Sequence, residues 1–173
     1  MRTADKALVT YASWSGTTAE VAECLRESLQ ADGLDVDLAA TRSVADIDQY
    51  ALVVAGTAIR MGRTHSDYRS FIARHRDVLA KTKFAAFIVC GTLKEKNEKT
   101  CSEAGTFLAS ALEAAPELAP IATATFGGAI AKRRLSWPYR LMFRLMGEKG
   151  GDWRDWNAIK SWGHEVAEKS GTR

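Results

Sequence analysis

Apolar stretches typical of buried strands alternate with stretches typical of helices, and this alternation restricts the fold of the 173-residue chain most strongly. The strand-like stretches cover residues 7–12, 34–39, 51–56, 84–91 and 121–128. The helical stretches cover residues 19–29, 66–79, 101–115 and 155–169. Alternating strands and helices predict a parallel sheet with helices on both faces and right-handed connections. We therefore expect one α/β domain over residues 1–173 with five parallel strands.

One turn in this pattern is rich in hydroxyl groups. The segment Ser13–Thr18 joins the first strand to the first helix and reads Ser-Trp-Ser-Gly-Thr-Thr. A helix start offers unpaired N–H groups and a positive dipole end, and Gly16 lets the backbone approach a ligand. The segment lacks both a lysine and the Gly-x-Gly-x-x-Gly pattern, so the two common nucleotide loops are excluded. It predicts a site for a phosphate monoester held by neutral donors.

An ordinary capped turn is the alternative interpretation of this segment. Thr17 and Glu20 have the spacing of a capping box at the helix start. A cap needs fewer hydroxyls than the four at positions 13, 15, 17 and 18, which favours the phosphate site.

Composition narrows the class of protein. No apolar run approaches the roughly 18–20 residues of a membrane span. The cysteines at positions 24, 90 and 101 lack metal-binding spacing, and the three histidines form no metal motif. An odd number of such cysteines indicates reduced thiols in a cytoplasmic protein. We expect no metal site and no nucleic-acid partner.

The segment Ser-x-Ser-Gly-Thr-Thr, directly after the first strand, resembles the loop with which flavodoxins hold the phosphate of FMN. The resemblance implies a flavodoxin-like three-layer sandwich with strand order 2-1-3-4-5. Its ligand would lie where strand order reverses, at the carboxyl ends of the strands. The implied cofactor-binding residues follow the first, third and fourth strands: Ser13, Trp14, Ser15, Gly16, Thr17, Thr18, Thr57, Ala58, Ile59, Arg60, Gly62, Gly91, Thr92 and Leu93.

The chain departs from carrier flavodoxins in two respects. Those proteins usually place aromatic side chains of the second and third loops against the flavin ring, whereas residues 57–63 and 91–100 contain no aromatic residue here. Carrier flavodoxins also tend to be strongly acidic, whereas the formal net charge of this chain is +3. Both differences favour a flavin whose face is open to another molecule.

The pattern Ile59-Arg60-x-Gly62-x-x-His65 resembles a stretch of the bacterial menaquinone-dependent protoporphyrinogen dehydrogenases, which are flavodoxin-like. Two catalytic residues follow from it. Arg60 would place a positive charge beside the flavin, or else meet solvent or a carboxylate. His65 would transfer protons, because its ordinary pKa lies near neutrality, or else cap the next helix. The cap is the favoured role for His65.

An insertion of about 26 residues, 129–154, separates the fifth strand from the last helix. Six basic residues and one acidic residue lie between positions 130 and 151. Pro138 opens an expected helix over 139–146, in which Arg140 and Arg144 share one face. This helix has three interpretations: it packs on the core, it lies on an anionic membrane surface, or it covers a flat apolar substrate that carries carboxylates.

The protoporphyrinogen dehydrogenase family has an insertion of this character at this place, with matches at Trp137, Arg140, Met142, Gly150-Gly151 and Asp155-Trp156. The resemblance implies FMN, oxidation of the tetrapyrrole protoporphyrinogen IX and electron delivery to a membrane quinone. It implies peripheral association with the inner face of the membrane. The residues expected to meet substrate or membrane are Lys132, Arg133, Arg134, Trp137, Arg140 and Arg144.

Two further functions stay open at this point. The chain would be an electron-transfer flavodoxin if it docks on a redox partner protein with an acidic face. It would be an interaction module if the pocket has lost its flavin.

Overall fold

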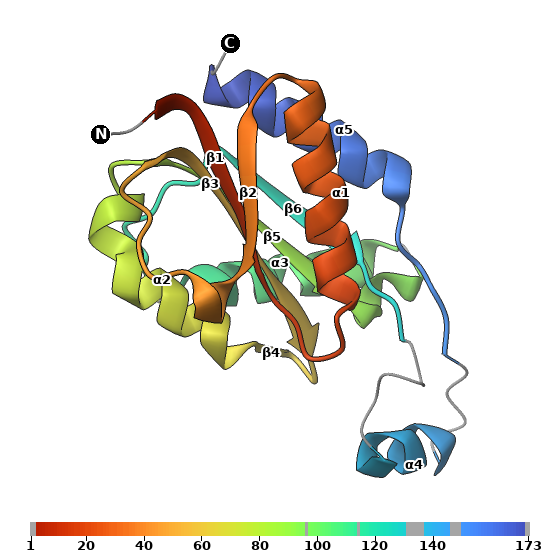
Figure 1. The fold of residues 1–173 in the computed structure, drawn as a ribbon. Coiled ribbons are helices and arrows are strands. Elements are labelled where there is room, and N and C mark those ends of the chain that lie inside the picture. The colour runs from red at the N-terminus through yellow and green to blue at the C-terminus, as the bar shows by residue number, and fades with distance from the viewer. Residues whose placement is uncertain (1–2, 96, 114, 131–136, 146–149, 172–173) are drawn as a thin grey trace.

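The structure, a computed structural model, describes residues 3–95, 97–113, 115–130, 137–145 and 150–171 (Figure 1). Among these residues, five parallel strands form a sheet in the order β2-β1-β3-β5-β6, and β4 pairs with β3. This order is the predicted 2-1-3-4-5 with one short strand added. The strands are β1 (Thr3–Ala12), β2 (Asp35–Ala40), β3 (Tyr50–Arg60), β4 (Arg63–Thr64), β5 (Lys83–Cys90) and β6 (Ala122–Gly127).

Helices cover both faces of the sheet, as expected (Figure 1). The helices are α1 (Thr17–Ala31), α2 (Ser66–Leu79), α3 (Glu98–Leu112), α4 (Trp137–Leu145) and α5 (Trp156–Ser170), with short 3₁₀ turns η1 (Thr41–Ser43) and η2 (Gly91–Lys94). Helices α1 and α5 lie on one face and α2 and α3 on the other, whereas α4 projects away from these layers (Figure 1).

Strand β5 shows how one sequence serves two cores. All residues from Phe84 to Cys90 are buried. Successive side chains of a strand point to opposite faces, so a strand covered on both faces is apolar throughout. Phe87 packs in the core beneath α1 and α5, while its neighbours Ala86 and Ile88 belong to the core beneath α2 and α3. Gly56 on β3 makes room for Phe87, because a Cβ there would lie 2.0 Å from the ring.

The segment after the third strand was expected to be a loop over residues 57–63, and this expectation was wrong. Strand β3 continues to Arg60, and β4 then pairs antiparallel with its end. Met61 and Gly62 make the turn with φ of 50° and 73°. Positive φ at both central residues is what a two-residue type I′ hairpin turn requires. The segment is therefore held by strand pairing.

Helix α3 begins three residues before its expected start at position 101. The reason is a capping box: Asn97 Oδ1 accepts from Thr100 N at 3.0 Å, and Thr100 Oγ1 accepts from Asn97 N at 3.0 Å. The expected polar loop over residues 92–100 is accordingly divided between η2 and the start of α3.

The two ends of the insertion lie side by side. Ala129 forms an antiparallel bridge with Asp152, and Trp153 N donates to Gly128 O at 3.1 Å. Gly127 has no room for a side chain, because a Cβ there would lie 2.3 Å from Trp153 O. Helix α4 begins at Trp137, slightly earlier than predicted, with Pro138 in its first turn.

Candidate functional site

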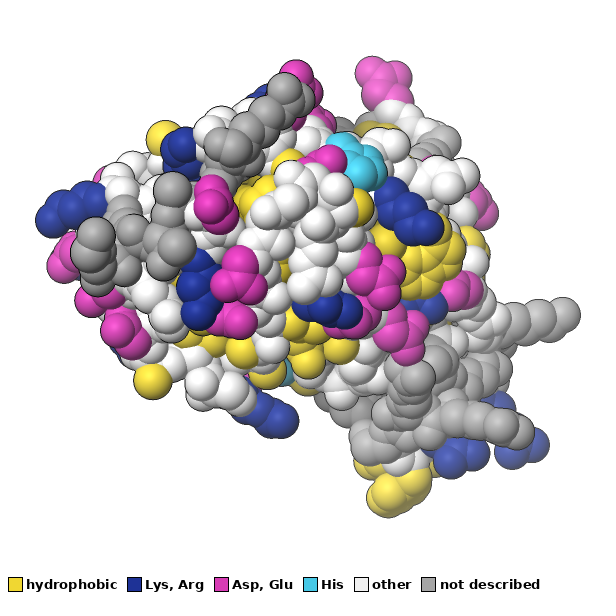
Figure 2. All heavy atoms as spheres, turned by 45° about the horizontal axis from the view of Figure 1, so that its top comes forward, with side chains coloured by type: hydrophobic (Ala, Val, Ile, Leu, Met, Phe, Trp, Pro, Cys, Tyr) yellow, Lys and Arg dark blue, Asp and Glu magenta, His cyan; other side chains and the backbone are white. Residues whose placement is uncertain are grey.

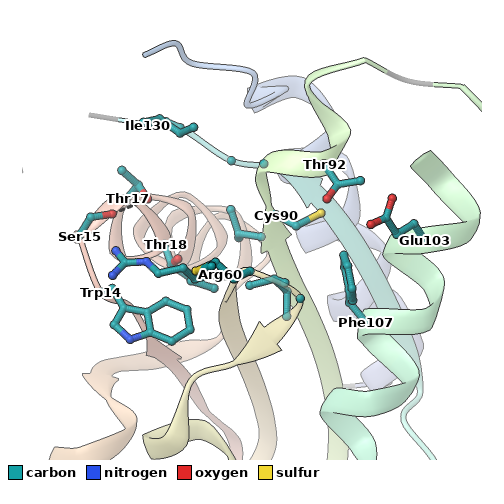
Figure 3. Close-up of a pocket in the computed structure, with 18 of the residues that line it drawn as sticks. Trp14, Ser15, Thr17, Thr18, Arg60, Cys90, Thr92, Glu103, Phe107 and Ile130 are labelled. Atoms are coloured by element: carbon teal, nitrogen blue, oxygen red, sulfur yellow. Dashed lines mark hydrogen bonds between the residues drawn. The ribbon is translucent and has the colours of Figure 1, made fainter. Parts of the chain in front are cut away.

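A cavity opens where β1, β3, β5 and β6 end (Figure 3). Its volume is about 600 Å³. This is the edge at which open parallel sheets bind ligands, and the volume lies within the usual range of ligand pockets. Four chain segments and two helices line it: Trp14, Ser15, Thr17, Thr18, Ala58, Ile59, Arg60, Met61, Gly62, Val89, Cys90, Gly91, Thr92, Glu103, Phe107, Gly128, Ala129, Ile130 and Met142.

The first loop turns sharply into α1. Gly16 is the N-cap with φ of 81°, and its N–H donates to Ser13 Oγ at 2.9 Å. Left-handed backbone of this kind favours glycine. The predicted capping box was wrong, because the N-cap is Gly16 and has no side-chain hydrogen bond to the helix, while Glu20 instead pairs with Arg154. The hydroxyls of this loop are therefore not used up by capping.

Thr18 tests whether a phosphate fits this loop. Its side chain is fully buried and lines the cavity, yet its Oγ1 has no hydrogen-bond partner in the described structure. A buried hydroxyl without a partner costs about 1–3 kcal/mol. It lies in the first turn of α1, where N–H groups and the helix dipole attract an anion. Ser15 and Thr17, whose hydroxyl oxygens lie 3.4 Å apart, line the same end. The donor set fits a phosphate ester.

Trp14 and Arg60 form one side of the cavity (Figure 3). The Arg60 guanidinium lies 4.9 Å from the centre of the Trp14 ring, a cation–π distance. The Trp14 ring also lies 4.5 Å from that of His65. Strand β3 and the first loop thus place a cation and an indole next to any ligand bound here.

His65 caps helix α2, which was its favoured role in the sequence. Its Nδ1 accepts from Asp67 N at 3.2 Å, and its backbone N–H donates to Thr57 Oγ1 at 3.2 Å. Thr57 is fully buried, and Leu93 packs in a small core with Cys90. Five residues predicted to be catalytic or to bind the cofactor are not among the described residues that line the cavity: Ser13, Gly16, Thr57, His65 and Leu93. A proton-transfer role of His65 stays a prediction.

Nine lining residues were not among the predicted site residues: Met61, Val89, Cys90, Glu103, Phe107, Gly128, Ala129, Ile130 and Met142. Glu103 and Phe107 are four residues apart on α3 and so share a helix face. That spacing was the available signal, although nothing in it says which face meets the cavity. Burial raises the pKa of the Cys90 thiol, and nearby Glu103 adds to that rise, so the thiol stays protonated at neutral pH.

Helix α4 presents apolar and basic side chains to solvent. Trp137 is 75% exposed, Leu141 49% and Leu145 80%. Arg140 and Arg144 are exposed beside them, and these arginines line a shallow groove with Trp137 and Leu141. Basic and apolar side chains lie side by side at the corner where α4 projects (Figure 2). The other predicted basic residues, Lys132, Arg133 and Arg134, lie outside the described residues.

The described part of the chain lacks two other kinds of functional element. No helix there is both long and apolar enough to cross a membrane. No group of three or more His, Cys, Asp and Glu side chains there is arranged to hold a metal ion.

Comparison with known proteins identifies relatives that cover most of the chain. The family model of the flavodoxin domain matches residues 8–155. Protoporphyrinogen IX dehydrogenase (quinone) of Escherichia coli K12 is 26% identical, with 94% of each chain covered. Oxidised flavodoxin 1 from Bacillus cereus has a TM-score of 0.59 at 17% identity, over 94% of this chain and 97% of that one. A flavoprotein in complex with FMN from Lactobacillus acidophilus has a TM-score of 0.51 at 17% identity, over 70% and 93%.

Proposed function

The chain belongs to the flavodoxin-domain family, and we propose that it is an FMN-dependent oxidoreductase that oxidises protoporphyrinogen IX and passes the electrons to a quinone. The observation that carries the proposal is the match with the E. coli dehydrogenase over 94% of each chain. Carrier flavodoxins share the layered fold, so the fold alone supports only the flavoprotein.

FMN is held at the cavity by its phosphate. Ser15, Thr17 and Thr18 supply hydroxyls at the start of α1, and Gly16 keeps the backbone accessible. The unpartnered Thr18 hydroxyl gains an acceptor when the phosphate binds. When bound, FMN supplies the capacity to take up and release two electrons.

The walls of the cavity orient the flavin ring and shape its electrostatics. Ala58 and Ile59 from β3, with Gly91 and Thr92 after β5, offer backbone groups to the polar edge of the ring. Arg60 lies against Trp14 and faces the cavity, so its charge favours negative charge on a group bound there. Phe107 and Met142 bring apolar surface from α3 and α4 and exclude water.

Helix α4 meets the substrate. A tetrapyrrole is flat, apolar and edged with carboxylates, which matches the groove of Trp137, Leu141, Arg140 and Arg144. Because Met142 lines the cavity from the same helix, a substrate held by α4 lies close to the cofactor. The exposed apolar and basic side chains of α4 also suit peripheral contact with an anionic lipid surface, where a quinone is available.

The test is anaerobic reduction of purified, FMN-loaded protein by protoporphyrinogen IX, followed as bleaching of the flavin absorbance. A menaquinone analogue is then added. Bleaching followed by recovery of the absorbance is the expected result. If dithionite bleaches the flavin and protoporphyrinogen IX does not, the dehydrogenase assignment is wrong and an electron-transfer flavodoxin with a protein partner takes its place. Colourless protein that takes up no FMN would instead leave an interaction module.

A further inference from the structure

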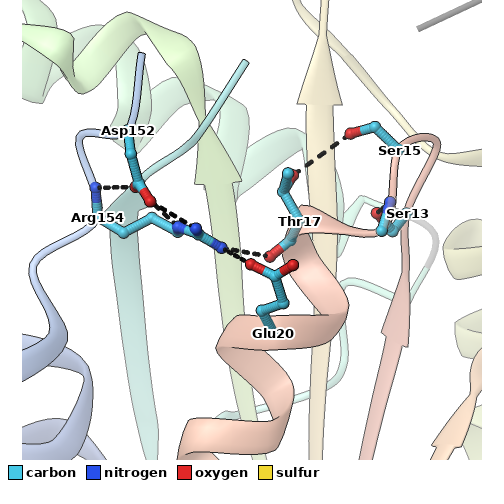
Figure 4. Close-up of polar contacts among 7 residues, drawn as sticks. Ser13, Ser15, Thr17, Glu20, Asp152 and Arg154 are labelled. Atoms are coloured by element: carbon cyan, nitrogen blue, oxygen red, sulfur yellow. Dashed lines mark hydrogen bonds and ion pairs between the residues drawn. The ribbon is translucent and has the colours of Figure 1, made fainter. Parts of the chain in front are cut away.

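Arg154 lies where the insertion returns to the domain (Figure 4). Its side chain is only 8% exposed. Its Nε donates to Asp152 Oδ1 at 2.8 Å and its Nη2 to Asp152 Oδ2 at 2.5 Å. Its Nη1 donates to Glu20 Oε2 at 2.5 Å and to Thr17 O at 3.3 Å. The guanidinium also stacks on Trp156, 4.6 Å from the ring centre. One cation thus joins two carboxylates to the first turn of α1.

The position of Glu20 makes this cation important. Glu20 lies in the first turn of α1, the turn that begins with Thr17 and Thr18. An acidic side chain at this end stabilises a helix by itself, but it repels a second anion bound at the same end. The buried Arg154 guanidinium offsets the charge of Glu20 and shares its remaining donors with Asp152.

Thr17 connects the ion pairs to the cavity. Its carbonyl accepts from Arg154, whereas its hydroxyl lies 3.4 Å from that of Ser15 at the cavity wall (Figure 4). No capping box fixes this turn, because the N-cap is Gly16, and the Glu20 side chain pairs with Arg154. Arg154 therefore holds the turn from the outer side and leaves the hydroxyls on the inner side for a ligand.

We propose that Arg154 is a positioning residue of the phosphate site, which neutralises the Glu20 carboxylate and holds Thr17 so that the first loop accepts a phosphate dianion. The inference rests on the proposed FMN binding and adds a requirement to it. Asp152, which bridges to Ala129, makes the returning arm of the insertion part of the same support. The insertion is thus coupled to cofactor retention as well as to the substrate side.

The experiment compares two ligands that differ only in the phosphate. FMN and riboflavin are titrated into apoprotein, and their dissociation constants are read from flavin fluorescence. Arg154→Gln is expected to weaken FMN binding about tenfold and to leave riboflavin binding within about twofold, because the repulsion acts only on the phosphate. The double variant Arg154→Gln with Glu20→Gln is expected to regain most of the lost FMN affinity. Arg154→Lys keeps the charge but loses the bidentate and stacked contacts, so its FMN affinity is expected to lie between those of wild type and Arg154→Gln.

Two further variants keep the test decisive if Arg154→Gln folds poorly. Glu20→Gln alone is expected to bind FMN as tightly as wild type or up to about threefold more tightly. Arg26→Gln breaks an Arg26–Glu23 pair farther along the same helix and is expected to change neither ligand.

An equal loss of FMN and riboflavin affinity in Arg154→Gln, no loss of either, or no recovery on adding Glu20→Gln would overturn the inference. Weaker FMN binding by Glu20→Gln would overturn it too. Wild-type protein that binds neither flavin would overturn the proposed function, and the role of Arg154 with it. If wild type binds FMN and all the variants bind it with the same affinity, only the role of Arg154 would be overturned.

Discussion

The phosphate loop and helix α4 are both rich in functional side chains, but they are held in opposite ways. Thr18 in the loop is fully buried between strand and helix, and Thr17 is fixed by Arg154. In α4, by contrast, Leu145 is among the most exposed large apolar side chains described, and Trp137 is nearly as exposed. The loop contains a buried hydroxyl, that of Thr18, without a hydrogen-bond partner. Helix α4 instead exposes large apolar side chains to solvent.

This difference indicates what each region binds. A buried hydroxyl at a helix start gains a hydrogen bond when a small anion with oxygen acceptors binds there. Exposed indole and leucine side chains next to arginines suit a large apolar ligand or surface that carries negative charge. The loop is therefore expected to bind the cofactor in a preformed site, and α4 is expected to acquire its partner from outside the chain.

Gly16→Val gives the largest expected effect, because it breaks the preformed site. The backbone φ of 81° costs a side-chain-bearing residue about 1–2 kcal/mol, and the isopropyl group also takes space next to the phosphate. FMN affinity measured by fluorescence titration is expected to fall about a hundredfold or more. An unchanged affinity would place the phosphate elsewhere.

Thr18→Val sharpens the same point without strain. Valine has nearly the shape of threonine and removes only the unpartnered hydroxyl, so the free energy of unfolding of the apoprotein is expected to stay level or rise. FMN binding is expected to weaken about tenfold while riboflavin binding is retained. A loss of apoprotein stability in thermal unfolding would show that the hydroxyl has a structural partner instead.

Reversal of charge on α4 tests the other region. Arg140→Glu with Arg144→Glu is expected to weaken sedimentation with vesicles that contain anionic lipid by about tenfold or more, since each basic residue near such a surface contributes about 1 kcal/mol. FMN content is expected to remain that of wild type, because these exposed side chains line only the groove on α4. Sedimentation equal to that of wild type would contradict contact between α4 and an anionic lipid surface.

A smaller effect is expected from pH, which changes the free energy of unfolding through a buried histidine of the core. His75 is buried against Phe71, and burial lowers its pKa below the ordinary 6.5. At pH values between that lowered pKa and 6.5, the unfolded chain binds more protons than the folded chain. The free energy of unfolding therefore falls as the pH drops below about 6.5, by at most about 1.4 kcal/mol per pH unit. His75→Phe is expected to remove this slope in urea unfolding between pH 7.5 and 5. An unchanged slope would assign the titration to another group.

Most strands and helices were predictable from the sequence, because they depend on local patterns of apolar residues. The apolar runs of β3 and β5 are uninterrupted, so they were recognised as central parallel strands, and the bounds of α2 were predicted correctly from its periodicity. The start of α3 was missed because a cap by Asn97 was not recognised. Strand β4 was missed because two residues carry no period.

The site was predictable only as far as it depends on the loops that follow strands. Ser15, Thr18 and Arg60 follow or end strands, and the structure places them at the cavity. Arg154 and Glu20 are 134 positions apart, and Phe107 reaches the cavity from the middle of a helix. Such pairings depend on how α1, α3 and the returning insertion pack, which no local pattern in one sequence reveals.

The central claim is that the loop holds the cofactor while α4 serves the substrate, and one rate comparison tests it most directly. Wild type and a variant with Trp137, Leu141 and Leu145 changed to Ser are loaded with FMN and reduced anaerobically by protoporphyrinogen IX. Equal FMN content, equal reduction by dithionite and at least about tenfold slower bleaching of the variant by protoporphyrinogen IX are predicted, because only the exposed apolar surface has been removed. Equal bleaching rates for the two proteins would contradict the account.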